Sequence, residues 1–143
     1  MNIRKATAAD YPGIMHVWES SVLATHHFLQ KSDFDLFKKI IPEQFLPALD
    51  LYVTGHDGRQ TGVLGVSGEN LEMLFIDAAS RGQGIGRQLV RFALSELGVT
   101  KVDVNEQNLQ AVGFYRKMGF VETGRSETDG MGKPYPLLHF TFP

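Results

Sequence analysis

Three glycines at alternate positions form a pattern whose chemistry can be read directly. Gly82, Gly84 and Gly86 lie between a run of apolar residues and a predicted amphipathic helix. Because glycine has no Cβ, several backbone N–H groups can converge there on one anion, and the helix N-terminus adds partial positive charge. The pattern therefore predicts a phosphate-binding loop. It comprises Arg81, Gly82, Gln83, Gly84, Ile85, Gly86 and Arg87.

The spacing of this loop excludes the two commonest nucleotide-binding signatures. A dinucleotide fingerprint starting at Gly82 needs glycine at Arg87, and one starting at Gly84 needs it at Leu89. A P-loop needs Gly-Lys-Ser/Thr, but the Gly-Lys of this chain is followed by Pro134. A nucleotide-binding regulator is therefore only a third hypothesis, behind the two described below.

The loop and a second block together resemble the GNAT superfamily of N-acetyltransferases. Arg81, Gly84 and Gly86 occupy the fixed positions of its Arg/Gln-x-x-Gly-x-Gly/Ala signature, although Ala78 stands where family members often have proline. The second block, Asn-x-x-Ala-x-x-Phe-Tyr-x-x-x-Gly-Phe, is matched at every spacing by Asn108, Ala111, Phe114, Tyr115, Gly119 and Phe120. Two matched blocks in family order make the resemblance specific.

The resemblance implies that acetyl-CoA is the acetyl donor and assigns residues to it. In the family, the loop amides hold the coenzyme A pyrophosphate, and the preceding strand, here Leu74, Phe75 and Ile76, offers backbone hydrogen bonds to the pantetheine arm. The family's tyrosine, here Tyr115, assists the departing sulfur, and Asn108 is carried over as a coenzyme contact. A phenol, with a pKa of ~10, is less acidic than a thiol at ~8.5, so Tyr115 is expected to stabilise the thiolate by a hydrogen bond.

An amine acceptor, with a pKa of ~10.4, must lose a proton before it attacks a thioester. Glu72 is the leading candidate for this base, because on a strand it shares a face with Leu74 and Ile76. Glu69, a histidine or water are alternatives. His26 and His27 follow the first predicted helix, where the resemblance places the acceptor wall, and are predicted to contact the substrate. Adjacent histidines lack a good metal-ligand spacing, and no metal is expected.

Hydrophobic periodicity predicts the elements that must position these residues. The nearly apolar strand 71–76 is expected to be central in the sheet and covered on both faces. Asp57-Gly58 predicts a tight hairpin turn between two strands. Strands are predicted at 1–6, 49–54, 61–66, 71–76, 99–104, 120–127 and 137–142, and helices after Pro12, from Ser32-Asp33, after the glycine loop and at 108–118.

This order, together with the resemblance, predicts an α/β (α+β) fold of the GNAT type. It would contain a mixed, mostly antiparallel central sheet of about seven strands, flanked by four helices. The length of 143 residues suits a single domain spanning residues 1–143.

Composition limits the class of partner. Fourteen Lys and Arg against sixteen Asp and Glu give a net charge of −2, which argues against nucleic-acid binding. No apolar run reaches the ~18 residues of a membrane span, and Met1–Ala6 lacks the apolar core of a signal peptide. A cytoplasmic monomer or homodimer is expected.

The leading hypothesis is an N-acetyltransferase that moves the acetyl group of acetyl-CoA directly to a primary amine of a small molecule or peptide. The chain has no cysteine to carry the acetyl group, and Gly65-Val66-Ser67-Gly68 lacks the Gly-x-Ser-x-Gly spacing of a serine nucleophile. The alternative is a non-catalytic acyl-CoA-binding or sensing module. Tyr115 favours the enzyme, because binding alone needs no hydroxyl at the sulfur.

Overall fold

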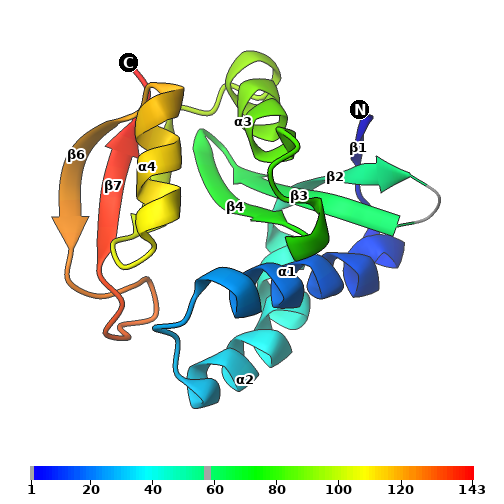
Figure 1. Ribbon diagram of the computed structural model, residues 1–143, viewed down its shortest axis with the longest axis horizontal. Helices are drawn as coiled ribbons and strands as arrows, with labels where there is room; N and C mark the ends of the chain where they lie inside the picture. Colours follow the sequence, from blue (N-terminus) through cyan, green and yellow to red (C-terminus); the bar gives the residue numbers. More distant parts are fainter. Residues whose placement is uncertain (1, 57–58) are drawn as a thin grey trace.

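A computed structural model describes residues 2–56 and 59–143 of the chain (Figure 1). The strands are β1 (Ile3–Lys5), β2 (Asp50–His56), β3 (Arg59–Ser67), β4 (Asn70–Ile76), β5 (Lys101–Asn105), β6 (Val121–Ser126) and β7 (Leu137–Thr141). The helices are α1 (Tyr11–Thr25), α2 (Lys31–Ile40), α3 (Ile85–Glu96) and α4 (Leu109–Met118). Within the described ranges, no helix is long and apolar enough to cross a membrane.

The strands form one seven-stranded sheet in the order β1-β2-β3-β4-β5-β7-β6. Only β4 and β5 run parallel; the other neighbouring pairs are antiparallel. The predicted order of strands and helices and the mostly antiparallel sheet are therefore confirmed. The hairpin of β2 and β3 is antiparallel as predicted, whereas its predicted turn residues Asp57 and Gly58 lie outside the described residues.

The segment between α1 and β2 is largely helical although it contains two prolines. Helix α2 begins at Lys31, one residue before the predicted Ser32, and is followed by short helical segments at Ile41–Phe45 and Leu46–Ala48. Pro42 and Pro47 each lie in the first turn of a new segment, where the missing N–H has no intrahelical partner to lose. The chain thus changes helix type at each proline instead of leaving the helical conformation.

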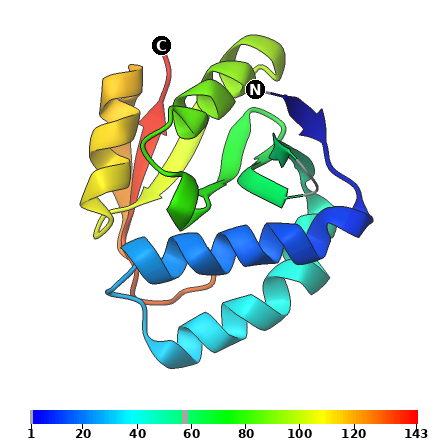
Figure 2. The same cartoon turned by 45° about the vertical axis from the view of Figure 1, so that its right-hand side comes forward.

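Helices cover both faces of the sheet, and each face has its own core. On one face, α3 and α4 pack over a cluster that includes Leu64, Leu89 and Phe140, while α1 packs over Val53 and Val63 on the other. Figure 2 shows α1 running across the sheet with α2 beside it. Glycine at position 62 of β3 allows α3 close to the sheet, because a Cβ there would lie 2.8 Å from Ile85 Cγ2.

The sheet opens between β4 and β5. These strands pair only at Asn70 with Lys101 and at Leu71 with Val102, although β4 stays paired with β3 as far as Ile76. The predictions that β4 is central and covered on both faces are confirmed, because Leu74 and Ile76 pack against the core on one face and Met73 and Phe75 against the core on the other. Along residues 72–76 of β4 no side chain is fully buried, because the diverging strands leave these residues lining a cleft.

Candidate active site

A cleft of about 280 Å³ occupies the space where β4 and β5 separate. Its walls come from β4, β5, the glycine loop, the end of α1 and α4. Divergence of two strands thus gathers residues that are far apart in the sequence. Of the predicted site residues, the cleft is lined by His26, Glu72, Leu74, Phe75, Ile76, Arg81, Gly86, Asn108 and Tyr115.

The open edge of β4 offers backbone hydrogen-bonding groups to this cleft. Asp77 N donates to Thr61 O at 2.9 Å, which continues the β3–β4 ladder. Because hydrogen bonding alternates along an antiparallel ladder, the N–H and C=O groups of Leu74 and Ile76 point away from β3, toward the side that β5 has left. An extended ligand with amide groups can pair with this edge as an added strand does.

The glycine loop ends in a helix N-terminus that the protein leaves uncapped. Gly82 and Gly84 have φ values of +78° and +80°, which side-chain-bearing residues rarely adopt, and Gly84 is the N-cap of α3. No side chain caps α3, and its first turn contains no acidic residue. The free N–H groups and the helix dipole therefore favour an anion supplied from outside the chain.

The remaining loop residues differ in position. Four of them are exposed and do not line the cleft: Gly82, Gln83, Gly84 and Arg87. The side chain of Ile85, the first residue of α3, is buried in the core between α3 and the sheet. Ile85 can therefore meet a ligand only through its backbone. Arg81 reaches across the cleft, where its Nη2 donates to the Gln110 side-chain oxygen on α4.

Tyr115 is buried beside the cleft, with its ring against those of Phe114 and Phe120 at centroid distances of 5.1 and 5.5 Å. Among the described residues none forms a hydrogen bond with its hydroxyl, and no buried side-chain polar atom lacks a partner, so the hydroxyl reaches the open cleft. Burial raises the pKa of the Tyr115 phenol above its usual range. The group thus keeps its proton and serves as a hydrogen-bond donor.

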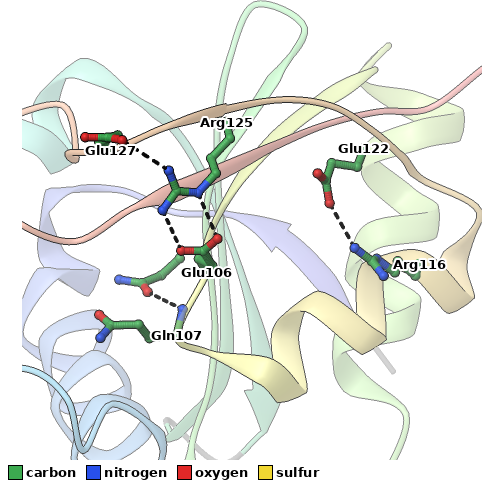
Figure 3. Close-up of polar contacts among 7 residues, drawn as sticks. Glu106, Gln107, Arg116, Glu122, Arg125 and Glu127 are labelled. Carbon is green, nitrogen blue, oxygen red and sulfur yellow. Dashed lines mark hydrogen bonds and ion pairs between the residues drawn. The ribbon is translucent and has the colours of Figure 1, made fainter.

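Ion pairs tie β6 to the turn before α4 and to α4 itself (Figure 3). This turn leads to Asn108, which lines the cleft. Arg125 on β6 donates to both carboxylate oxygens of Glu106 at 2.8 and 2.9 Å, and Glu106 N donates to Pro136 O at 2.8 Å. Arg116 on α4 bonds Glu122 of β6 at 2.9 Å. Asn108 caps α4 by accepting from Ala111 N at 3.2 Å, so it has a structural role besides lining the cleft.

A second cavity of about 540 Å³ lies on the other side of Glu72. Its walls are mostly apolar and come from α1, the segment 28–45, β4 and the loop before β7, with aromatic rings from Trp18, Phe28, Phe37, Phe45, Phe75 and Tyr135. The two cavities share the wall residues His26, Glu72, Met73, Phe75 and Asn105. Glu72 therefore stands where a ligand in one cavity would meet a ligand in the other.

The two candidate glutamates have opposite environments. Partial burial, and secondarily the charge of Asp103, raise the pKa of the Glu72 carboxyl, which strengthens it as a base. Glu69 accepts from Thr100 Oγ1 at 2.6 Å and lies 3.7 Å from Lys101 Nζ, and these contacts lower its pKa. Glu69 lines neither cavity, so the geometry favours Glu72.

The two neighbouring histidines are placed differently. His26 lines both cavities, and its Nδ1 lies 2.7 Å from Thr25 Oγ1, while burial, and secondarily His27, lower its pKa to about 4. At neutral pH it is therefore an uncharged hydrogen-bonding group. His27 is exposed and lines neither cavity.

A buried polar cluster that sequence reasoning missed braces the second cavity. The Tyr135 hydroxyl donates to Asp33 Oδ2 and accepts from Gln30 N at 3.2 Å, while Lys133 Nζ lies 2.8 Å from Asp33 Oδ1. The cluster ties the start of α2 to the loop before β7. Its members are about a hundred positions apart in the sequence, so no local pattern could have revealed it.

Across residues 2–56 and 59–143, no three His, Cys, Asp or Glu side chains are grouped so that they could hold a metal ion. The arrangement instead offers an anion site, an amide-bonding strand edge and a carboxylate between two cavities. These features suit a phosphate-bearing donor with an amide-containing arm, and an acceptor that must lose a proton.

Comparison with known proteins agrees with this chemistry. The family described as acetyltransferase (GNAT) domain matches residues 24–133. Peptidyl-lysine N-acetyltransferase YjaB of Salmonella typhimurium is 44% identical over 144 residues, covering 100% of this chain and 99% of the relative. YjaB of Escherichia coli is 42% identical over 143 residues, covering 99% and 97%.

Solved structures give the same fold. The solution structure of apo YjaB from Escherichia coli superposes with a TM-score of 0.89 at 42% identity, covering 99% of this chain and 96% of that one. PaiA N-acetyltransferase from Thermoplasma acidophilum, solved with coenzyme A, has a TM-score of 0.76 at 18% identity, covering 99% and 98%. The second likeness shows the fold alone.

Two glycines of the loop should fail in different ways when replaced by alanine. At Gly86 a Cβ fits, 3.5 Å from Phe114 Cζ and 3.9 Å from Ile76 Cδ1, but the methyl group adds bulk to the lining of the cleft. At Gly84 nothing lies within 4 Å, but the positive φ strains an alanine by about 1 kcal/mol. Calorimetric titration with coenzyme A and chemical unfolding should show weaker binding without destabilisation for Gly86→Ala, and lower stability for Gly84→Ala. Unchanged affinity in Gly86→Ala would contradict the placement of the ligand.

Proposed function

This chain belongs to the GNAT family of acetyltransferases, and from that premise we propose that its acceptor is the ε-amine of a lysine side chain in a protein. Membership makes it an acetyl-CoA-dependent N-acetyltransferase, as the sequence predicted. The relatives that match over their full length are named peptidyl-lysine N-acetyltransferases, which supports a protein lysine as acceptor. We further propose that residues 1–143 act as one catalytic domain.

The meeting of the two cavities at Glu72 is the observation that carries this proposal. A lysine side chain has a flexible stem of methylenes that can pack against the apolar walls of the second cavity, among them Phe37 and Phe45. Its amine then reaches the carboxylate at the shared wall. An N-terminal α-amine has no such stem, so it would fill this cavity less well.

The coenzyme is assigned to the first cavity. The open edge of β4 at Leu74 and Ile76 would bond the amides of the pantetheine arm, with Phe75 between them packing on the acceptor side. The backbone of residues 81–87, at the uncapped start of α3, would hold the pyrophosphate. Asn108 and Arg81 would border the arm from opposite walls.

The proposed transfer is a direct attack. Glu72 accepts a proton from the lysine ammonium, and the neutral nitrogen bonds to the thioester carbonyl carbon as the carbon–sulfur bond breaks. The sulfur leaves as a thiolate, which the Tyr115 O–H stabilises by a hydrogen bond without giving up its proton. The nitrogen still carries two protons when it bonds to the carbonyl carbon; it loses one of them, and this proton passes through water to the departing thiolate. The products are an acetylated lysine and coenzyme A, and Glu72 returns its proton to solvent.

The acceptor is tested with peptides. A peptide with one internal lysine and a blocked N-terminus should release thiol from acetyl-CoA with saturable kinetics, and mass spectrometry should place the acetyl group on lysine. Matched controls are a peptide with a free N-terminus and no lysine, and a small polyamine. Turnover confined to either control would exclude a protein lysine as acceptor.

Tyr115→Phe should lower kcat by roughly 10- to 100-fold, because one hydrogen bond to a developing charge contributes about 1.5–3 kcal/mol. Affinity for coenzyme A and stability should stay close to wild type, because the hydroxyl has no partner among the described residues. Tyr135→Phe is the matched control: it loses the contact with Asp33 and should raise the KM for the peptide instead. Equal small effects of Tyr115→Phe on kcat and affinity would argue against assistance at the sulfur.

Glu72→Gln should lower turnover by ~10²- to 10⁴-fold and remove the acidic limb of the pH–rate profile. Because the folded pKa of Glu72 is raised, its favourable contribution to stability is present at low pH and lost as pH rises through that pKa. The variant should therefore be at least as stable as wild type at pH 7, with no advantage at pH 4. Thermal unfolding at both pH values measures this, and a loss of stability at pH 7 would point to a structural role for Glu72.

A further inference from the structure

A row of hydrogen-bonded polar side chains crosses the C-terminal half of the sheet. Asp103 Oδ1 on β5 lies 2.6 Å from His139 Nδ1 on β7, and His139 Nε2 lies 2.7 Å from Ser126 Oγ on β6. Because a carboxylate only accepts, the imidazole donates to Asp103 through Nδ1–H. None of these residues belongs to the matched sequence blocks or to the proposed transfer step.

The register of the sheet brings this row to Glu72. Leu71 of β4 pairs with Val102 of β5, so Glu72 and Asp103 are the next residues of two parallel strands as these begin to separate. Leu71 and Val102 both contribute to the core beneath α3 and α4, so the next residue on each strand, Glu72 or Asp103, lies on the opposite face. The prediction that Glu72 shares a face with Leu74 and Ile76 is therefore wrong, because the β3–β4 register shifts between Leu71 and Met73. Both carboxylates line the cleft. On the edge of β5 that is away from β4, Asp103 pairs in register with His139 of β7.

We propose that Asp103 is a positioning residue for acetyl transfer: oriented by His139, which Ser126 holds in turn, it places a carboxylate beside Glu72 and assists the uptake of the acceptor's proton there. This inference rests on the proposed role of Glu72. The two carboxylates have different partners, because Asp103 accepts a hydrogen bond from the imidazole, whereas no described residue donates to Glu72. The imidazole thus orients Asp103, while Glu72 is left with its carboxylate facing the cavities.

The electrostatic surroundings agree with this assignment. After burial, the charge of Asp103 is the second cause that raises the pKa of Glu72. The other ionisable groups lining the two cavities are His26, Arg81, Tyr115, Asp129 and Tyr135. His26 and the two tyrosines are uncharged at neutral pH. Arg81 is charged and bonds the neutral side chain of Gln110, while Asp129 Oδ1 accepts from the backbone N–H groups of Met131 and Lys133. Neither Arg81 nor Asp129 is a cause of the raised pKa of Glu72.

The Ser–His–Asp order also occurs in nucleophilic triads, but a hydrolytic role does not fit here. Ser126 and His139 line neither cavity, so an acyl group bound in the cleft would not lie against the serine hydroxyl. The end of the row that meets a cavity is the carboxylate. Within this row, therefore, only Asp103 can influence a group in the cleft, and that group is Glu72.

Asp103→Asn tests the inference, because the amide oxygen still accepts from His139 while the charge is removed. The pKa of Glu72, followed by NMR of its ¹³C-labelled side-chain carboxyl and assigned with Glu72→Gln, should fall by roughly half a pH unit. The acidic limb of kcat/KM for the lysine peptide should move to lower pH by the same amount. The value of kcat/KM at the pH plateau should fall by up to about twofold, because a weaker base accepts the proton less readily.

Glu69→Gln is the matched control. It removes one carboxylate charge just before β4, from a residue bonded to Thr100, and should move neither the Glu72 titration nor the acidic limb. An unchanged Glu72 titration in Asp103→Asn would overturn the inference. So would a raised KM for the peptide with no movement of the acidic limb of kcat/KM, because that result would make Asp103 an ammonium-binding group. If the pKa of Glu72 moves but the acidic limb of kcat/KM does not, Glu72 is not the catalytic base. In that case the proposed role of Asp103 in the transfer is also wrong.

Discussion

The structure depends on the early end of pairing between β4 and β5. After Leu71 and Val102 the two strands separate, so the backbone groups of Leu74 and Ile76 face a cleft inside the protein. Unpaired backbone groups removed from water are costly, and a ligand with amides of its own can satisfy them. The same separation gives α4 and the glycine loop access to one space, and it brings the Tyr115 hydroxyl to the end of that space.

The two cavities divide the work that a direct transfer requires. The cleft combines a strand edge and an uncapped helix N-terminus, which suit a ligand with amides and phosphates. The second cavity combines aromatic walls with the Glu72 carboxylate at the wall it shares with the cleft, which suits an aliphatic amine. Tyr135 lines this cavity and is held by Asp33, which also pairs with Lys133, so the wall depends on a tie between α2 and the loop before β7.

Placing the carboxylate at the shared wall lowers the stability of the folded protein and increases the basicity of Glu72. Glu72 is partly desolvated and faces the charge of Asp103, and both effects disfavour its ionised form in the folded protein. In the proposed mechanism this is what makes Glu72 able to take a proton from an ammonium group. At the same wall, burial lowers the pKa of His26, whereas it raises that of Glu72. The imidazole is therefore neutral and can form hydrogen bonds.

The sequence by itself determined the order of strands and helices, the family and the position of the glycine loop. These follow from local causes: the period of apolar residues, the positive φ at Gly82 and Gly84, and two blocks of fixed spacing. Only the tertiary structure decided where β4 and β5 separate, that His26 but not His27 faces the cavities, and that Asp33 meets Tyr135. These contacts join residues distant in the chain, and their geometry depends on how the whole sheet twists and packs, which no local pattern specifies.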